Sequence, residues 1–250
     1  MIVIKTASEL KLMKTAGRIS QRALRLAGEA VEPGVTTAEI DRLVKKYIEE
    51  QGAVPSFLGY GGFPASCCIS VNNVVIHGIP SDKCILKQGD IVSIDVGAYI
   101  GGYHGDNAWT FACGDISEEA QRLLDAAKQA LFEGIKQAQA GNRIGHIGHA
   151  VQTYAELRSY SVVRDFVGHG VGAKLHEEPK VPNYGVPLQG AKLLPGMVIA
   201  IEPMINMGSH RVKVLKDNWT TVTADGKLSA HFEHTLAVTP DGPVILTLPD

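Results

Sequence analysis

The sequence predicts an α+β fold in which two helix pairs cover one face of a largely antiparallel sheet. Three observations favour this fold: helical patterns occur in two separate regions, β-type runs follow each of them, and the two halves of the chain resemble each other. The 250 residues are 45% hydrophobic and 20% charged, which is typical of a globular protein with a large core. We therefore expect a single domain over residues 1–250, with pseudo-repeat halves at about 8–115 and 116–240.

The first half is expected to begin with two helices. An apolar pattern of helical period starts near Ser8, and Pro33-Gly34 breaks it. Thr37 is the N-cap candidate of the second helix. Runs of apolar and β-branched residues then predict strands at 68–71, 91–96 and 108–112.

The second half repeats this order of elements. Ser117 is the N-cap candidate of a third helix, and Ala140-Gly141 separates that helix from a fourth. Further strands are expected at residues 197–201, 210–214 and 232–239. An offset of 107 residues places the helix-breaking Gly34 on Gly141. The matched glycine and the matched order of elements indicate an internal duplication.

Composition excludes several classes of protein. The net charge of -2 gives no general attraction to nucleic acids, and no run approaches the roughly 20 apolar residues of a membrane span. Residues 1–20 mix charged and apolar positions, unlike a signal peptide, so a cytoplasmic location is expected. The cysteines fit neither paired zinc spacing nor a disulfide framework and are expected to be reduced thiols; they lie at 67, 68, 84 and 113.

Two aspartates are expected to share one face of a hairpin. Asp95 ends an alternating strand, and Asp106 follows a turn near Ile100-Gly101-Gly102. If the turn centres on the first two of these residues, the aspartates are directly opposed. If it centres on the two glycines, they are diagonal neighbours. Two like charges this close repel, unless a cation lies between them, one is protonated, or both reach water.

Three more residues favour the cation. Glu202 and Glu233 interrupt otherwise apolar strands, and an inward carboxylate costs several kcal/mol unless it is paired or bound to metal. His169 stands between two glycines, which would let a ligand approach its ring closely. Four carboxylates and one imidazole suit Mn, Fe, Co or Zn, and four negative charges balance two divalent ions.

These five residues, in this order, resemble the metal ligands of type I methionine aminopeptidases, which have the pita-bread (creatinase/aminopeptidase-like) fold. The resemblance covers essentially the whole chain and includes the strings NNVVIHGIP (72–80), GYHGD (102–106), GHGVG (168–172), LHEEP (175–179), IEPM (201–204) and FEHT (232–235). It implies a single catalytic domain with two divalent metal ions, Co, Mn, Fe or Zn. Asp106 and Glu233 would bridge the ions, Asp95 would chelate one, and His169 with Glu202 would complete the other.

The same resemblance implies the removal of N-terminal methionine from nascent proteins by metal-activated water attack on the first peptide bond. Glu202 would accept the proton of that water. His176 would hydrogen-bond the substrate carbonyl or the developing oxyanion, and His77 would contact the substrate near the scissile bond.

A narrow apolar pocket is expected to select methionine. The positions that line it in the family correspond here to Phe57, Tyr60, Phe63, Cys68, Leu175 and Trp219, together with His77 and His176 as further substrate contacts. Phe57, Phe63 and Leu175 depart from residues found at these positions in the family, so the inhibitor and substrate preferences are left open.

The remaining histidines are expected not to bind metal: His104, His146, His149, His210, His231 and His234. The expected partners are the N-termini of nascent polypeptides and, by inference from that task, the ribosome, with neither nucleic-acid specificity nor membrane contact. The protein is expected to be a monomer.

Three alternative interpretations fit less well. A sibling peptidase that cleaves before proline usually carries a sizeable N-terminal domain, whereas the helical half here begins by Ser8. A metal-free binding module would be expected to have lost ligand positions. A type II enzyme would carry a helical insert between His176 and Glu202, which are separated by only 25 residues.

Overall fold

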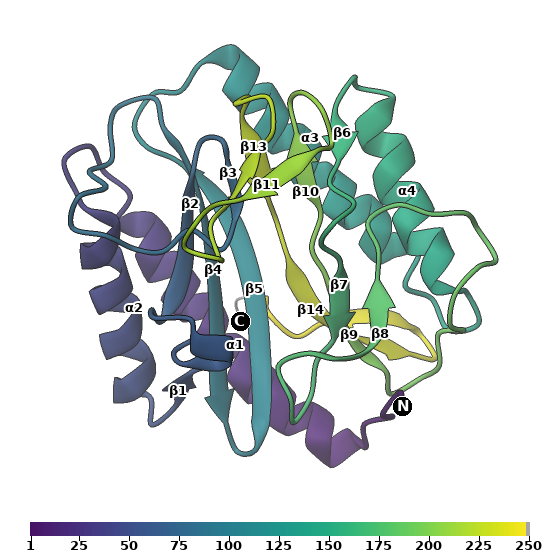
Figure 1. The fold of residues 1–250 in the computed structure, drawn as a ribbon. Coiled ribbons are helices and arrows are strands. Elements are labelled where there is room, and N and C mark those ends of the chain that lie inside the picture. Colours follow the sequence, from purple (N-terminus) through teal and green to yellow (C-terminus); the bar gives the residue numbers. More distant parts are fainter. Residues whose placement is uncertain (249–250) are drawn as a thin grey trace.

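The structure is a computed structural model that describes residues 1–248. Its α-helices form two pairs, each packed against strands of its own half (Figure 1). The first pair is α1 (Ala7–Glu29) and α2 (Thr37–Glu50), and the second is α3 (Glu118–Lys136) and α4 (Ile144–Glu156). These helices agree with the predicted ones in order and in location.

Three of the four α-helices in the described chain begin at a threonine or serine whose hydroxyl group caps the helix. Thr6 caps α1 in a capping box with Glu9, and the Ser117 side chain accepts the backbone N–H of Ala120 at the start of α3. The prediction that Thr37 caps α2 is wrong by one residue. Thr36 is the cap, because its extended backbone lets its hydroxyl accept the N–H of Glu39 while Thr37 is already helical.

Every strand pairing within residues 1–248 is antiparallel, as predicted. In the first half β1 (Val54–Pro55), β4 (Ile91–Ile100) and β2 (Cys67–Val71) lie in that order, and β5 (Tyr103–Ala112) pairs with β4. In the second half the order is β15 (Gly242–Ile245), β14 (His234–Thr239), β9 (Val198–Ile201), β7 (Gly168–Gly170) and β8 (Glu177–Val181).

Shorter strands form two three-stranded sheets within the described chain. One contains β13 (Ser229–His231), β10 (Met204–Asn206) and β6 (Ser161–Val162); the other contains β11 (Val212–Val214), β12 (Thr221–Thr223) and β3 (Val74–Ile76). A 3₁₀ turn, η1, spans Tyr60–Gly62. The hairpin strands β4 and β5 are longer than the predicted ones because pairing continues up to the tight turn at Gly101-Gly102.

Each helix pair covers its own hydrophobic core. Positions related by the offset of 107 residues are buried in both halves: Ala23 and Ala130, and Val44 and Val151, have 0% exposure. We propose on this basis that the two halves arose by duplication. Trp109 packs against both cores and so links them.

No helix within residues 1–248 combines the length and apolar character that would let it cross a membrane. The four cysteines form no disulfide within this part of the chain, and three of them are buried, as expected for reduced thiols.

Candidate metal centre and active site

The β4–β5 hairpin places two aspartates on one face of the sheet. Asp95 pairs with Ala108, and Asp106 pairs with Gly97, so the turn centres on the two glycines and the carboxylates are diagonal neighbours. Of the two registers that the sequence allowed, the second is therefore the right one. Asp106 is buried, with 3% exposure.

The second half supplies three more polar side chains. His169 lies in β7 between Gly168 and Gly170, and a Cβ on either glycine would collide with the backbone of a neighbouring strand. Glu202 follows the last residue of β9, and Glu233 precedes the first residue of β14. The prediction that these glutamates interrupt strands is thus corrected: they lie at strand ends. The Glu233 N–H donates to the Ala108 carbonyl at 2.9 Å, which joins this end to β5.

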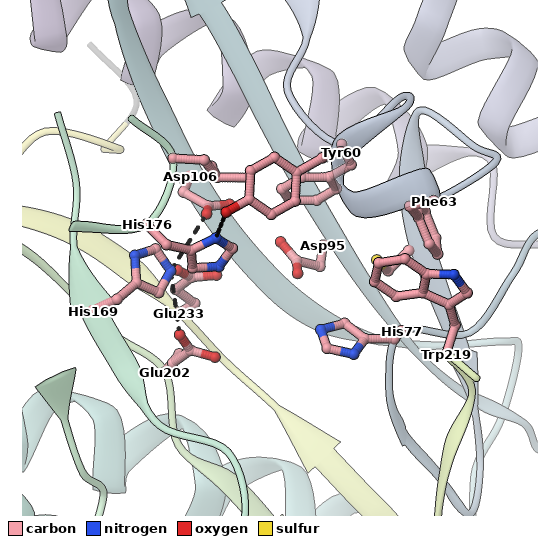
Figure 2. A pocket seen from close by; sticks show the side chains of 13 residues that line it. Tyr60, Phe63, His77, Asp95, Asp106, His169, His176, Glu202, Trp219 and Glu233 are labelled. Atoms are coloured by element: carbon pink, nitrogen blue, oxygen red, sulfur yellow. Dashed lines mark hydrogen bonds and ion pairs between the residues drawn. The ribbon is translucent and has the colours of Figure 1, made fainter. Parts of the chain in front are cut away.

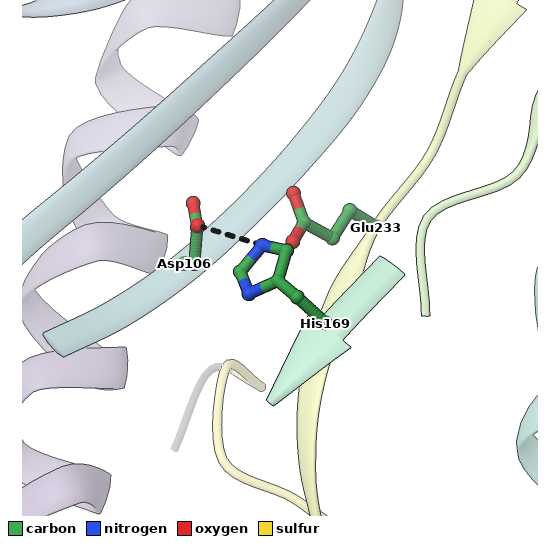
Figure 3. Close-up of side chains that lie close together, drawn as sticks. All are labelled: Asp106, His169 and Glu233. Carbon is green, nitrogen blue, oxygen red and sulfur yellow. Dashed lines mark ion pairs between the residues drawn. The ribbon is translucent and has the colours of Figure 1, made fainter. Parts of the chain in front are cut away.

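These side chains converge at a candidate metal centre (Figures 2 and 3). Asp106, His169 and Glu233 offer ligand atoms that all lie within 4.8 Å of one another. His169 Nε2 is 3.8 Å from Asp106 Oδ2 and 3.5 Å from Glu202 Oε1. Asp95 also points toward this group. All five predicted ligands therefore meet in one place, although they come from both halves of the chain.

Three of the carboxylates each have one oxygen without a hydrogen-bond partner within the described chain. Asp95 Oδ1, Asp106 Oδ1 and Glu233 Oε1 are buried without a hydrogen bond from residues 1–248. Burial raises the pKa of Asp106 to about 7. Burial, followed by the charge of Asp106, raises the pKa of Asp95, Glu202 and Glu233 well above the usual range. A cation would offset this repulsion, so the donor set fits divalent metal.

His169 is a neutral imidazole in a fixed orientation. Burial lowers its pKa to about 3, and the nearby His176 acts in the same direction. Its Nδ1 lies 2.9 Å from the Gly170 carbonyl, which assigns the proton to Nδ1 and leaves the Nε2 lone pair facing the carboxylates.

One cavity of about 140 Å³ connects this cluster to an apolar chamber. All thirteen predicted site residues line it: Phe57, Tyr60, Phe63, Cys68, His77, Asp95, Asp106, His169, Leu175, His176, Glu202, Trp219 and Glu233. The apolar end is a small separate core in which Trp219 meets the Phe63 ring edge-on at 5.1 Å. The cavity thus has a carboxylate floor and an apolar, aromatic wall.

Two histidines stand at the mouth and side of this cavity. His176 Nδ1 lies 2.7 Å from the Tyr60 hydroxyl, and its ring centre is 4.2 Å from that of His169. His77 has a positive φ of 58°, which is uncommon outside glycine, and its ring meets Trp219 edge-on at 6.0 Å. Figure 2 shows Asp95 between His77 and His176.

His231 has a place near the site that sequence reasoning missed. It is 2% exposed, and its Nε2 lies 3.7 Å from Glu202 Oε2 with no hydrogen-bond partner among residues 1–248. The available signal was its spacing of two residues from Glu233, which places both side chains on one face in extended backbone. Among residues 1–248, none of the six histidines expected not to bind metal lines the cavity.

Comparisons with known proteins agree with this geometry. Residues 11–240 match Metallopeptidase family M24. The chain is 56% identical over 248 residues to a methionine aminopeptidase of Clostridium perfringens, with 99% of each chain covered.

Solved structures extend the comparison to the fold. The methionine aminopeptidase from Thermotoga maritima superposes with a TM-score of 0.98 at 44% identity, with 100% of both chains covered. A prolidase from Pyrococcus horikoshii shares the fold alone, with a TM-score of 0.81 at 24% identity; the match covers all of this chain and 65% of the prolidase. These likenesses confirm the predicted pita-bread fold. The chain therefore belongs to metallopeptidase family M24 and groups within it with the methionine aminopeptidases.

Proposed function

We propose that this protein is a methionyl aminopeptidase that removes N-terminal methionine from polypeptides. One observation carries this proposal: a single small cavity joins a cluster of five metal-binding side chains to an aromatic, apolar chamber. A substrate that fits both ends carries an unbranched apolar side chain next to a free amine and a peptide bond. The sequence identity of 56% to a methionine aminopeptidase supports the same substrate.

The metal would be held by Asp95, Asp106, His169, Glu202 and Glu233. We propose two divalent ions, drawn from Co, Mn, Fe and Zn, because four carboxylates carry enough charge to balance two. When bound, such ions lower the pKa of water and polarise a carbonyl group. The orphaned oxygens of Asp95, Asp106 and Glu233 support this assignment.

The chain's own residues would then handle the proton and the substrate. Glu202 would accept the proton of the attacking water, because its carboxylate lies in the cluster, with Oε1 3.5 Å from His169 Nε2. His176, whose Nδ1 faces the Tyr60 hydroxyl, would use Nε2 to bind the substrate carbonyl oxygen as negative charge develops there. His77 would contact the peptide on the other side of the scissile bond.

The methionine side chain would lie among Phe57, Phe63, Cys68, Leu175 and Trp219. Four of these are buried, with exposure of 8% or less, so the chamber excludes water and favours a flexible thioether over a charged or branched side chain. Tyr60 is 44% exposed and would close the outer side.

The cellular setting is a further part of this proposal. We infer that the protein acts as a monomer in the cytoplasm, on the N-termini of nascent polypeptides as they leave the ribosome. The support is the task itself, since methionine must be removed while the N-terminus is still accessible. Sedimentation of the purified protein with and without ribosomes would test both the monomer and the association.

The decisive experiment is the release of free methionine from Met-Ala-Ser by metal-stripped protein to which Mn, Co, Fe or Zn is returned. We expect metal-dependent release from this peptide, and none from N-acetylated Met-Ala-Ser or from Lys-Pro-Ala. Cleavage of the proline peptide instead would indicate a prolidase-like specificity. Bound metal without any cleavage would contradict the proposed function.

A further inference from the structure

A buried ion pair outside the metal centre joins the first residues of the chain to the active-site loop. Lys5 Nζ lies 2.5 Å from Glu177 Oε2, and the two side chains are only 2% and 10% exposed. A buried charge is strongly destabilising without its partner, so this pair fixes the position of both groups. Lys5 and Glu177 do not line the metal-bearing cavity.

Glu177 organises the loop that precedes it. Its second oxygen, Oε1, accepts the backbone N–H of Lys174 at 3.2 Å. Gly172 leaves the space that this carboxylate occupies, because a Cβ there would collide with it. The loop is closed further by the Gly172 N–H, which donates to the Lys174 carbonyl at 3.1 Å, and by the His104 N–H, which donates to the Gly172 carbonyl at 3.0 Å. One carboxylate therefore holds residues 172–177 in shape.

The same loop carries two residues of the active-site cavity. Leu175 is 2% exposed and belongs to the apolar wall. His176, the residue next to Glu177, reaches Tyr60 and lies beside His169. A shift of the Glu177 carboxylate would consequently move His176 relative to the carboxylate floor.

Lys5 is itself anchored on both halves of the molecule. Its backbone N–H donates to the Gly196 carbonyl at 2.8 Å, in the turn before β9. The next residue, Thr6, caps α1, and Glu9 in that cap accepts the Tyr103 hydroxyl at 2.7 Å. Lys5 is thus held in a fixed position by its neighbours, and its ion pair with Glu177 fixes the loop relative to it.

We propose that Lys5 and Glu177 are positioning residues for His176. This inference rests on the proposed peptidase function, since His176 is assigned there to the substrate carbonyl. The ion pair places the His176 ring within reach of that carbonyl, and its loss leaves the proposed metal ligands in place on β4, β5, β7 and the ends of β9 and β14. The pair therefore acts on turnover through the loop, not through metal binding.

The test uses Lys5→Met and Glu177→Gln, singly and together, with Val44→Ala as a control in the core of α2. Val44 is fully buried, so its truncation lowers stability without touching the loop. The measurements are kcat and KM on Met-Ala-Ser at saturating metal, metal content, thermal midpoint, and amide hydrogen exchange of residues 171–177.

We expect Lys5→Met to lower kcat by about tenfold to a hundredfold, because small misplacements of a reacting geometry have effects of this size. Its metal content stays at the wild-type level, and exchange in residues 171–177 becomes faster. The double variant loses no more kcat than Lys5→Met alone, since both substitutions remove one interaction. The double variant also lacks the Glu177 carboxylate, which is buried and unpaired in Lys5→Met. If Lys5→Met does not fold, kcat and loop exchange are therefore measured on the double variant. Val44→Ala lowers the midpoint and keeps kcat and loop exchange.

A purely structural role makes a different prediction. If Lys5→Met and Val44→Ala lower the midpoint equally, and both keep kcat and loop exchange, the positioning role is wrong. If the wild-type protein releases no methionine, the peptidase function fails, and loop exchange alone decides whether the ion pair sets the loop.

Discussion

At the scale of single residues, the buried carboxylates of the cavity floor carry a large electrostatic cost. Burial raises the pKa of Asp95, Asp106, Glu202 and Glu233, and the charge of Asp106 raises the pKa of the other three further. Three oxygens of this set are buried without a partner in residues 1–248. Such a group is costly in a folded protein unless it binds something cationic. The cluster is therefore better explained by its ligand than by its contribution to stability.

Two substitutions separate metal binding from catalysis. Glu233→Ala removes a ligand, so we expect metal affinity to fall more than the roughly tenfold to hundredfold loss typical of outer partners, and activity to fall with it. His176→Ala should keep the metal and lower kcat by about a hundredfold to a thousandfold, as for the loss of one oxyanion donor. Metal content by elemental analysis, measured beside kcat and KM, distinguishes them. Equal metal loss in the two variants would contradict the assigned roles.

The sequence allowed the five proposed ligands to be singled out, because acidic residues in apolar runs and a glycine-flanked histidine are visible without a structure. It did not reveal His231, whose nearness to Glu202 depends on the pairing of β13 with β10, in which His231 faces Met204. This contact follows from the docking of distant segments, whereas the spacing of two residues from Glu233 indicates only a shared face. The resemblance to a family, and not the composition, supplied the residues of the apolar chamber.

At the scale of elements, the β4–β5 hairpin and α1 cross very closely. A Cβ on Gly105 would overlap the backbone of Ala16 and Gly17 in α1, and backbone cannot rotate aside as a side chain can. Asp106 follows directly, and its carbonyl accepts the Thr235 hydroxyl at 2.7 Å. The glycine before Asp106 is thus required by packing, and it brings the helix close to the strand that holds a metal ligand.

We expect Gly105→Ala to destabilise the protein by about 1–3 kcal/mol, the usual range for overpacking. Gly105→Ser should destabilise it further, since the added atom meets the same backbone. Urea unfolding of the metal-free protein measures both. A midpoint unchanged in both variants would mean that α1 is free to move away from β5.

The start of α1 gives a pH-dependent prediction. Hydrogen bonds from Thr6, and then from Tyr103, lower the pKa of Glu9 from 4.5 to about 2. A depressed carboxyl pKa contributes stability that is complete above the unfolded value and is lost as the pH falls toward the folded value. The difference in urea midpoint between wild type and Glu9→Gln should be full at pH 7 and shrink between about pH 5 and 2. Glu29→Gln, at the exposed end of the same helix, is the control for the loss of one carboxylate from α1.

Element boundaries show where sequence reasoning stops. Both Thr36 and Thr37 are good caps by residue type, and only backbone geometry decides between them. Both hairpin registers satisfied the alternation of Asp95 and Asp106, and the choice depended on which residues adopt positive φ, which are Gly101 and Gly102. The order and type of the main elements were predictable because their periodic patterns are long.

At the scale of the whole molecule, the two halves meet at the candidate metal centre. Asp95 and Asp106 come from the first half, and His169, Glu202 and Glu233 come from the second. The hydrogen bond from the Glu233 N–H to the Ala108 carbonyl also joins the two halves through the backbone. The proposed duplication explains why two similar helix-covered halves pack side by side in Figure 1 and leave the site between them. The order of helix pairs and strands was predictable from the sequence, whereas the contacts between the two halves could not be predicted from either half alone.

Metal removal should therefore loosen the whole molecule rather than one loop. A ligand at a hundred times its dissociation constant stabilises the native state by about 2.7 kcal/mol, which corresponds to about 5–10 °C in a protein of this size. We expect calorimetry to show one unfolding transition that moves up by this amount when Mn or Co is added to stripped protein. The same addition should leave the midpoint of Glu233→Ala nearly unchanged. Two separate transitions, with only the second-half transition responding to metal, would mean that the ligands of the first half do not share the ions, and the proposed five-residue centre would then have to be divided.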